Sequence, residues 1–522
     1  MKNHITRYLG RILVPVPFLF GLIGLTKTPG YSLLDCAYHS VQLYVMEFAD
    51  GIVMNPCVEI ARWTAPCITV AAIITFFYRL VERLRILRLT FRRDPVMIHG
   101  DSANIAVMLD QMKHRAMISE DKMGYRVGRQ LVMFDRDEDM FEYINSHRKE
   151  LLSGSSKVIL CSENIRRGSY ENTQITICNL SENCARLYWE QHPVLREDEK
   201  ILIIGTGNYG TGILSQAILN NVISADSSIS YHVAGDYREY LITHPGICRA
   251  MEVYTEDGEG REHLYREALN VCGNRDQIHF HNRSWQEVVS GFGPFDRVII
   301  VTDSDADNLN ILNEIKLYFC NDIYHIKYID RETLKDLWDL DKENITPFGV
   351  REELFNEDTI MRDGLFRRAG KIHSRYFSRY LCREREEGSC RQTAASACPD
   401  CPAFIKDWNS LNVFVRYSNV AQADHVPVKL RLLLGREADI NEPGIGERAA
   451  AAYKALGEDE QNRLREIEHI RWCRYHFFNN WEYAPERDNQ RHRHPCLVPF
   501  RELAEKDKRK DEDAYLALSE LL

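Results

Sequence analysis

The sequence predicts a mixed α/β chain, and three patterns support this prediction. A strand, a glycine turn and a helix follow one another between residues 200 and 221. Apolar strand candidates alternate with helical stretches from residue 94 to about residue 335, a pattern typical of a parallel sheet covered by helices. Two apolar segments lie before residue 93, where they predict a membrane module.

The central unit has the features of a nucleotide-binding turn. An apolar strand at 201–204 leads into a turn with glycines at 205, 207 and 210. Glycines let the backbone approach a pyrophosphate, whose charge then rests on the amides at the helix N-terminus. A second strand, 231–235, ends where a ribose-binding carboxylate is expected. The predicted ligand is NAD or another nucleotide, and the predicted cofactor-binding residues are Gly205, Gly207, Asn208, Tyr209, Gly210, Asp236, Thr302 and Asp303. The alternative is a helix packed closely on a strand, with no nucleotide.

Composition excludes several classes of protein. The net charge of −10 and pI near 6.0 argue against a nucleic-acid partner. Fifteen scattered cysteines indicate a reducing compartment rather than a disulfide framework. No paired base and nucleophile stands out, so no catalytic residue is predicted. Acidic residues 303, 305 and 307 are expected to cap or flank a helix rather than to bind a metal. A zinc site at Cys382, Cys390, Cys398 and Cys401 stays open, with ordinary reduced thiols favoured.

The first 93 residues predict two membrane spans. Ile12 to Thr26 carries no charge but is short for a bilayer, whereas Cys57 to Tyr78 would form about 33 Å of helix. Arginines follow the second segment and basic residues precede the first, which places both ends in the cytoplasm. We expect a multi-pass protein of the inner membrane, with lipid as a partner and most of the chain cytoplasmic. The alternative for the first segment is a cleaved signal peptide, but no small-residue cleavage site follows it.

The loop between these segments resembles the pore region of two-helix potassium channels. Asp35, Tyr38, Ser40 and Val41 match the pore-helix pattern, and residues 45–50 stand where the filter would be. Glu47 and Ala49 replace the two filter glycines, so the resemblance implies a nonspecific cation pore rather than potassium selectivity. The predicted pore residues are Glu47, Phe48 and Asp50. The alternative is a re-entrant helix that plugs a membrane bundle.

Residues 94–335 read as two related units. In the first, Gly100 matches Gly205, but Ser102 and Ile105 replace the other glycines, so this copy is expected to have lost its ligand. The second contains an insertion with a charged helix near 261–271, and residues 323–330 are expected to close its sheet. Its strand from Phe295 runs into a helix that residue 305 or 307 would cap.

The glycine turn and the pattern Phe-Asp-x-Val-Ile-Ile-Val-Thr-Asp-Ser-Asp-x-x-Asn from Phe295 resemble the TrkA-N/RCK family, the cytosolic regulators of potassium channels and transporters. The resemblance implies tandem Rossmann-like units that sense a nucleotide. It also implies a homo-oligomer, a dimer or tetramer, beneath a pore.

The C-terminal third carries a second resemblance. Residues 362–387 predict a long charged helix, followed by a linker. Blocks at 408–411, 417–430, 468–474, 480–483 and 494–503 resemble the bacterial ryanodine-receptor (RyR) domain, which implies a mainly helical fold that binds nucleotide-derived signals in phage defence or stress. Aromatic faces suit a base and guanidinium groups suit a phosphate. The predicted ligand-binding residues are Asn419, Lys429, Arg471, Trp472, Trp481, Tyr483 and His494. Alternatively, both tryptophans are core and the basic run 491–494 is a solvated turn.

Five segments are therefore expected: a pore-like membrane module (1–93), a degenerate Rossmann-like unit (94–195), a TrkA-N/RCK unit (196–335), a helical linker (336–403) and an RyR domain (404–522). Together they predict a nucleotide-responsive membrane effector or ion channel, not an enzyme, in antiphage or stress signalling. The alternative function is a membrane-tethered enzyme that uses NAD.

Overall fold

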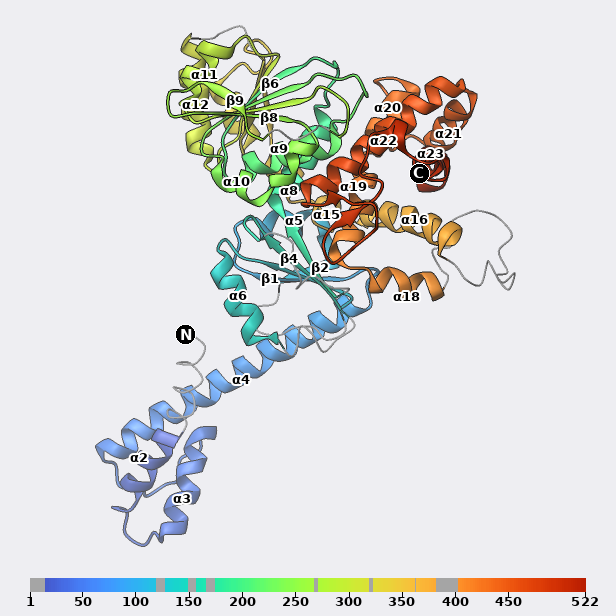
Figure 1. Ribbon diagram of the computed structural model, residues 1–522. Helices are drawn as coiled ribbons and strands as arrows, with labels where there is room; N and C mark the ends of the chain where they lie inside the picture. Colours follow the sequence, from blue (N-terminus) through green and yellow to red (C-terminus); the bar gives the residue numbers. More distant parts are fainter. Residues whose placement is uncertain are drawn as a thin grey trace. The chain divides into compact units, whose positions relative to one another are not determined.

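The computed structural model describes residues 15–118, 127–148, 156–165, 174–266, 271–318, 323–361, 363–381 and 402–522. The chain divides into two compact units, Met1–Pro95 and Val96–Leu522. Figure 1 shows the helical first unit in blue and the two sheets and the C-terminal helices of the second.

Close helix packing organises the first unit, which contains α2 (Pro15–Leu25), α3 (Leu33–Gln42), the 3-10 turn η1 (Leu43–Val45) and α4 (Pro56–Thr90). A Cβ at Gly21 would lie 2.9 Å from Ser40 Oγ, and one at Gly24 would lie 2.7 Å from Val58 Cγ2. Only glycine permits this approach of α2 to α3 and α4. The spacing of three residues places both glycines on one face of α2.

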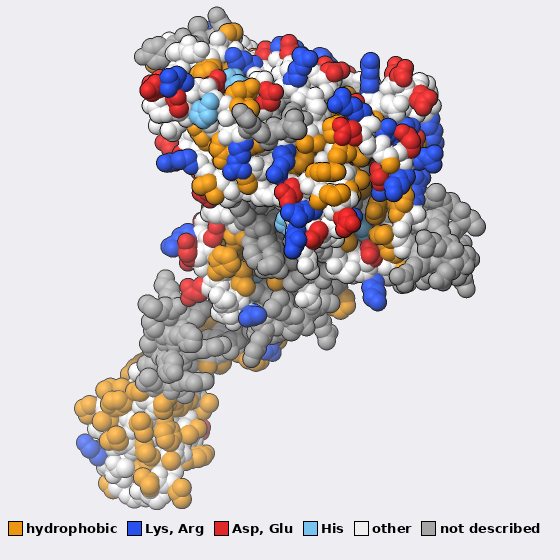
Figure 2. All heavy atoms as spheres, in the orientation of Figure 1, with side chains coloured by type: hydrophobic (Ala, Val, Ile, Leu, Met, Phe, Trp, Pro, Cys, Tyr) orange, Lys and Arg blue, Asp and Glu red, His pale blue; other side chains and the backbone are white. Residues whose placement is uncertain are grey.

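Among the described residues, one helix, α4, is long and apolar enough to cross a membrane. Its outward side chains are apolar, with Trp63 71% and Phe76 63% exposed, and the first unit presents an extensive hydrophobic surface at the lower left of Figure 2. Helix α2 has 11 residues and so covers only about 16 Å. The predicted first span begins at residue 12, outside the described residues, and the two-span arrangement stays a prediction.

The first sheet of the second unit is parallel, with strand order β2-β1-β3-β4-β5. Its strands are β1 (Val96–Gly100), β2 (Ala116–Ile118), β3 (Arg129–Met133), β4 (Lys157–Ser162) and β5 (Ile175–Asn179). Helices α5 (Ile105–Met112), α6 (Asp137–Ser146) and α8 (Leu180–Gln191) alternate with them, and the 3-10 turn η2 (Lys113–Arg115) follows α5. Alternating strands and helices therefore predicted this sheet correctly.

The second sheet has the order β13-β12-β11-β6-β7-β10-β8-β9 and is parallel except for β9. Its strands are β6 (Lys200–Ile204), β7 (Ser230–Ala234), β8 (Glu252–Glu256), β9 (Glu262–Leu264), β10 (Gln277–His281), β11 (Arg297–Ile300), β12 (Tyr324–Lys327) and β13 (Ile345–Phe348). The helical segments that follow its strands are α9 (Asn208–Asn220), α10 (Arg238–Thr243), η3 (Pro245–Arg249), α11 (Trp285–Phe292), α12 (Asp305–Tyr318) and α13 (Arg331–Leu337).

Two expectations for this sheet are wrong. The charged helix expected near 261–271 begins instead as β9, because residues 262–264 pair antiparallel with β8 at the sheet edge. Residues 323–330 do not close the sheet either, because β13 pairs with β12 in the register Tyr324 to Ile345. The sheet therefore continues past the boundary expected at residue 335.

Helices dominate the rest of the chain, as predicted. They are α14 (Arg351–Leu354), α15 (Glu357–Met361), α16 (Asp363–Tyr380), α18 (Pro402–Ser410), α19 (Val413–Asp424), α20 (Val426–Leu434), α21 (Ile445–Ala455), α22 (Glu458–Phe478), α23 (Glu505–Leu516) and α24 (Leu518–Leu521). A short strand pair, β14 (Glu482–Tyr483) and β15 (Arg493–His494), and the 3-10 turn η4 (Phe500–Glu502) lie between α22 and α23. The helix predicted at 362–387 is described to Tyr380, and Cys382, Cys390, Cys398 and Cys401 lie outside the described residues.

A buried ion pair joins α22 to the second sheet. Arg474 Nη2 lies 2.5 Å from Asp276 Oδ2, and both side chains are 0% exposed. Arg474 Nη1 also donates to the carbonyl oxygen of Ile218, at the end of α9. The other Asp276 oxygen accepts from the amide of Ile229 at 2.9 Å. The Arg474–Asp276 pair therefore connects α22, α9 and the residue that precedes β7.

Replacing Asp276 with alanine is expected to lower the free energy of unfolding by roughly 3–5 kcal/mol, because Arg474 is then left charged and unpaired in the interior. Chemical denaturation of the full chain measures this change. The matched control is Asp198→Ala, which removes a carboxylate that is 72% exposed and should cost less than about 1 kcal/mol. Equal effects from the two variants would contradict the role given to Asp276.

Candidate functional site

The glycine turn after β6 is required by the packing of the protein itself. Gly205 has a φ of +131°, and a Cβ there would lie 2.5 Å from the carbonyl oxygen of Val301. A Cβ at Gly210 would lie 2.1 Å from the carbonyl oxygen of Gly205. These glycines let α9 pack closely against β6 and β11, which supports the packing alternative weighed from the sequence.

The amides predicted to hold a phosphate are bound by Asp303. The backbone N–H groups of Asn208 and Tyr209 each donate to its carboxylate at 3.1 Å. A Cβ at Gly207 would lie 2.2 Å from Asp303 Oδ2, so this glycine makes room for the carboxylate. A helix N-terminus attracts an anion, and here the anion is the chain's own side chain. Asp303 was predicted as a ligand contact, and sequence reasoning missed this role.

Asn208 and Tyr209 also connect the two sheets. Tyr209 donates its hydroxyl to Glu163 Oε1 at 3.1 Å, and Asn208 Nδ2 donates to Asn164 Oδ1 at 2.5 Å. Glu163 and Asn164 follow β4 of the first sheet. Burial raises the pKa of Tyr209, and the Glu163 carboxylate adds to this effect. The side chains of the turn therefore make contacts within the protein.

Two other predicted contacts stand at the carboxyl edge of the second sheet. Thr302 donates its amide and its hydroxyl to Asn308 Oδ1 at 2.7 and 2.8 Å. Asp236 is exposed at the end of β7, where it accepts from Arg238 Nε at 2.9 Å. This hydrogen bond lowers the pKa of Asp236 to about 2. Thr302 is therefore hydrogen-bonded to the first turn of α12, whereas Asp236 faces solvent.

The cap of α12 differs from the expected one. Ser304 Oγ accepts from the amide of Asp307 at 3.2 Å, so the hydroxyl of Ser304 provides the cap. Asp305 instead accepts from Lys327 Nζ at 2.7 Å and from the amide of Ile329 at 2.8 Å. The expectation that residue 305 or 307 caps the helix is therefore wrong.

The predicted pore residues lie in the loop between η1 and α4. Phe48 packs on a buried cluster within the first unit, and the Arg62 guanidinium lies 4.9 Å from its ring centroid. Glu47 and Asp50 are exposed. These positions leave the pore prediction open.

A second candidate site is a cavity of about 250 Å³ between α16, α19, α22 and α23. It brings together Asn419, Arg471, Trp472 and His494, four of the side chains predicted from the RyR resemblance. The ring of Trp472 lies 3.9 Å from that of His476 and 4.9 Å from that of His494, between centroids. Helix α22 and strand β15 therefore supply one aromatic wall.

The other three predicted residues do not line this cavity. Lys429 is fully buried behind it. Trp481 stacks between Phe414, at 4.8 Å, and His492, at 5.3 Å, so the core interpretation applies to this tryptophan. Tyr483 is 54% exposed on β14.

Glu468 at the cavity wall is paired with two buried cations, Arg471 and Lys429. Glu468 lies 2.7 Å from Arg471 Nη2 and 2.8 Å from Lys429 Nζ. Burial raises the pKa of Glu468, but the two cations outweigh burial and lower it to about 2. Arg471 is 1% exposed, and its Nη1 has no hydrogen-bond partner among the described residues. A buried guanidinium with an unused donor favours an anionic ligand.

Sequence reasoning missed three further residues of this cavity. His469 and His476 share a helix face with Trp472, and their spacing of three and four residues was a usable signal. Burial lowers the pKa of His469 to about 4. Asp511 comes from α23, and burial raises its pKa well above its usual value.

Replacing Asp303 with alanine is expected to strengthen binding of a nucleoside diphosphate at the glycine turn by about tenfold or more, because the two amides lose their internal anion. Titration calorimetry with ADP measures the change. The control is Asp303→Ala combined with Gly207→Asp, which returns a carboxylate to the turn and should abolish the gain. Tighter binding by the wild type than by Asp303→Ala would contradict this account.

Acid is expected to destabilise the fold through His469. Its pKa is about 4 in the folded chain and about 6.5 when unfolded, so only the unfolded state gains its proton between these values. Its contribution is fully present above pH 6.5 and falls by about 1.4 kcal/mol per pH unit as the pH drops toward 4. Denaturant titrations should show a shallower pH slope for His469→Gln than for the wild type. Identical slopes would contradict the burial of a neutral imidazole.

Comparison with known proteins gives two findings. A protein-family model described as the RyR domain matches residues 456–521, which include Arg471, Trp472 and His494. Among solved structures, the "Crystal structure of the GsuK bound to ADP" aligns at 12% identity and a TM-score of 0.30, covering 67% of this chain and 94% of that one. No curated protein matches. The RyR resemblance is thereby confirmed for residues 456–521.

Proposed function

We propose that this chain is a membrane-anchored sensor that binds a nucleotide-type ligand in the cavity beside Trp472. One observation carries the proposal. Arg471 is buried at the cavity wall and keeps an unused hydrogen-bond donor. Burying a cation without satisfying its donors costs free energy, which an anionic ligand recovers.

The cavity offers complementary groups for the two ends of a nucleotide. The rings of Trp472 and His476 present flat faces for a base. Arg471 offers charge-assisted hydrogen bonds to a phosphate, and Arg487 and Lys510 also line the cavity. Burial lowers the pKa of His494 to about 4, so near neutral pH this side chain is neutral and can donate or accept. The RyR match over 456–521 supports the same site.

The cavity is mechanically linked to the second sheet through α22. Arg471 and Arg474 are one helical turn apart, and Arg474 is paired with Asp276. A ligand that draws Arg471 toward itself acts on the helix that this ion pair holds. A ligand that binds more tightly to one position of α22 therefore increases the population of that position, and the change reaches the second sheet through Asp276.

We place the output of this sensor in the membrane module. The length and apolar character of α4 support a span, and a multi-pass arrangement in the inner membrane, assembly as a dimer or tetramer, and cation conduction extend the proposal. A role in antiphage or stress signalling follows from the family resemblance. The glycine turn is a secondary nucleotide site, since a phosphate there has to displace Asp303. The alternative, a membrane-tethered enzyme that uses NAD, would need its cofactor at the same turn, where Asp303 already binds the two amides.

Mass spectrometry of molecules that copurify with the detergent-solubilised chain tests the proposed site. We expect a phosphate-bearing aromatic ligand with the wild type. Trp472→Ala should weaken its binding roughly tenfold or more, because stacking contributes about 1–3 kcal/mol per base.

Tyr483→Ala is the matched control, since it removes an exposed aromatic ring outside the cavity. It should retain the ligand. Equal retention by both variants, or a ligand without an anionic group, would refute the proposed site.

A further inference from the structure

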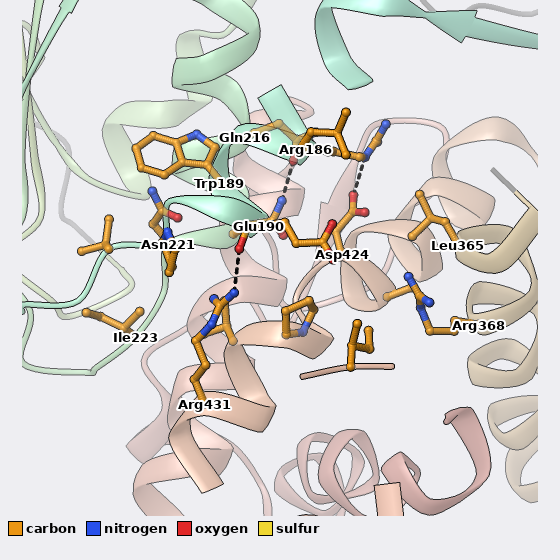
Figure 3. Close-up of a pocket in the computed structure, with 18 of the residues that line it drawn as sticks. Arg186, Trp189, Glu190, Gln216, Asn221, Ile223, Leu365, Arg368, Asp424 and Arg431 are labelled. Atoms are coloured by element: carbon orange, nitrogen blue, oxygen red, sulfur yellow. Dashed lines mark hydrogen bonds and ion pairs between the residues drawn. The ribbon is translucent and has the colours of Figure 1, made fainter. Parts of the chain in front are cut away.

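A second, larger cavity lies between the sheet domain and the C-terminal helices. Its volume is about 590 Å³, within the range typical of small-molecule sites. Helices α8 and α9 form one wall, and α16, α19 and α20 form the other. Figure 3 shows their side chains converging on it. This cavity shares no lining residue with the one beside Trp472.

Four arginines line this cavity, and among the described residues Arg368, Arg431 and Arg436 form no ion pair with a carboxylate. Arg186 is paired, with its Nε 2.8 Å from Asp424 Oδ2. Arg368, by contrast, makes no ion pair or hydrogen bond with any described residue, and its Nε is buried. Arg431 donates only to the backbone carbonyl oxygen of Glu190, at 2.9 Å (Figure 3). Burial lowers the pKa of both Arg368 and Arg431.

Unused acceptors line the same cavity. The Glu190 side chain is exposed and forms no ion pair within the described part of the chain, and desolvation raises its pKa while the charges of Arg368 and Arg431 oppose this rise. Asn220 is 7% exposed, and its Oδ1 has no hydrogen-bond partner among the residues the structure describes. A bound molecule that supplies hydrogen-bond donors as well as negative charge would complement both the arginines and the acceptors, Asn220 Oδ1 in particular. Inorganic phosphate lacks the array of hydroxyl donors that a sugar provides, and a neutral sugar lacks the negative charge that suits the arginines.

We propose that this cavity binds a sugar phosphate, with its phosphate against Arg368 and Arg431 and its hydroxyls donating to Glu190 and Asn220. The occupant contacts α8 and α9 on one side and α16 and α20 on the other. It therefore stabilises the arrangement of the helices around the second sheet, and it does so through residues that do not line the Trp472 cavity. This second site does not depend on the proposed nucleotide site.

Titration calorimetry with ribose 5-phosphate on the detergent-solubilised full chain tests this inference. The wild type should bind it, whereas ribose and inorganic phosphate should each bind at least tenfold more weakly. Arg368→Gln and Arg431→Gln should each lose tenfold or more in affinity. Arg367→Gln, which removes the exposed neighbouring guanidinium, should bind as the wild type does.

Trp472→Ala should also keep this affinity, which separates the two cavities. Amide hydrogen exchange in residues 363–368 should slow when ribose 5-phosphate binds. If Arg368→Gln does not fold, the affinity of Arg431→Gln decides the outcome. The inference is overturned if the wild type does not bind at millimolar concentration, or if both arginine variants bind normally. It is also overturned if inorganic phosphate binds as tightly as ribose 5-phosphate.

Discussion

The ion pair between Arg474 and Asp276 is the constraint on which the second unit, Val96–Leu522, depends. Both groups are fully buried, and an interior charge is tolerated only with a well-placed partner. Asp276 precedes β10, while Arg474 is on α22, nearly 200 positions later in the sequence. Their contact therefore fixes the position of this helix against the second sheet. Arg471, one turn earlier, is thereby held at the wall of the Trp472 cavity. Ligand recognition and domain packing share one helix.

Backbone amides that could bind an external anion are bound instead by carboxylates of the chain itself. At the central turn the anion is Asp303, held by the Asn208 and Tyr209 amides. In the first sheet the Asp135 carboxylate similarly accepts from the amide of Ala103 at 3.3 Å. Glycine turns therefore persist because helices must approach strands closely. Unused cationic donors are found elsewhere among the described residues, and those that line cavities include Arg471 Nη1 and Arg368 Nε.

Local patterns predicted much of the fold, and they failed where distant residues decide the outcome. The strand, turn and helix around Gly205 are visible in the sequence because periodicity and glycine chemistry are local. The role of Asp303 depends on β11 lying beside β6, and that of Lys429 on its burial against Glu468; neither is a local property. Trp472 and Trp481 look alike in sequence, yet one lines a cavity and the other stacks on Phe414. Burial assigned from residue type could not separate them.

We propose that binding of a ligand in the Trp472 cavity changes ion conduction by the first unit. Ion flux into liposomes containing the purified chain tests it directly, with the copurifying nucleotide added to the ligand-stripped protein. We predict flux with the wild type, little or none with Trp472→Ala, and unchanged flux with Tyr483→Ala. Flux that is independent of the nucleotide, or unaltered in Trp472→Ala, would contradict the account.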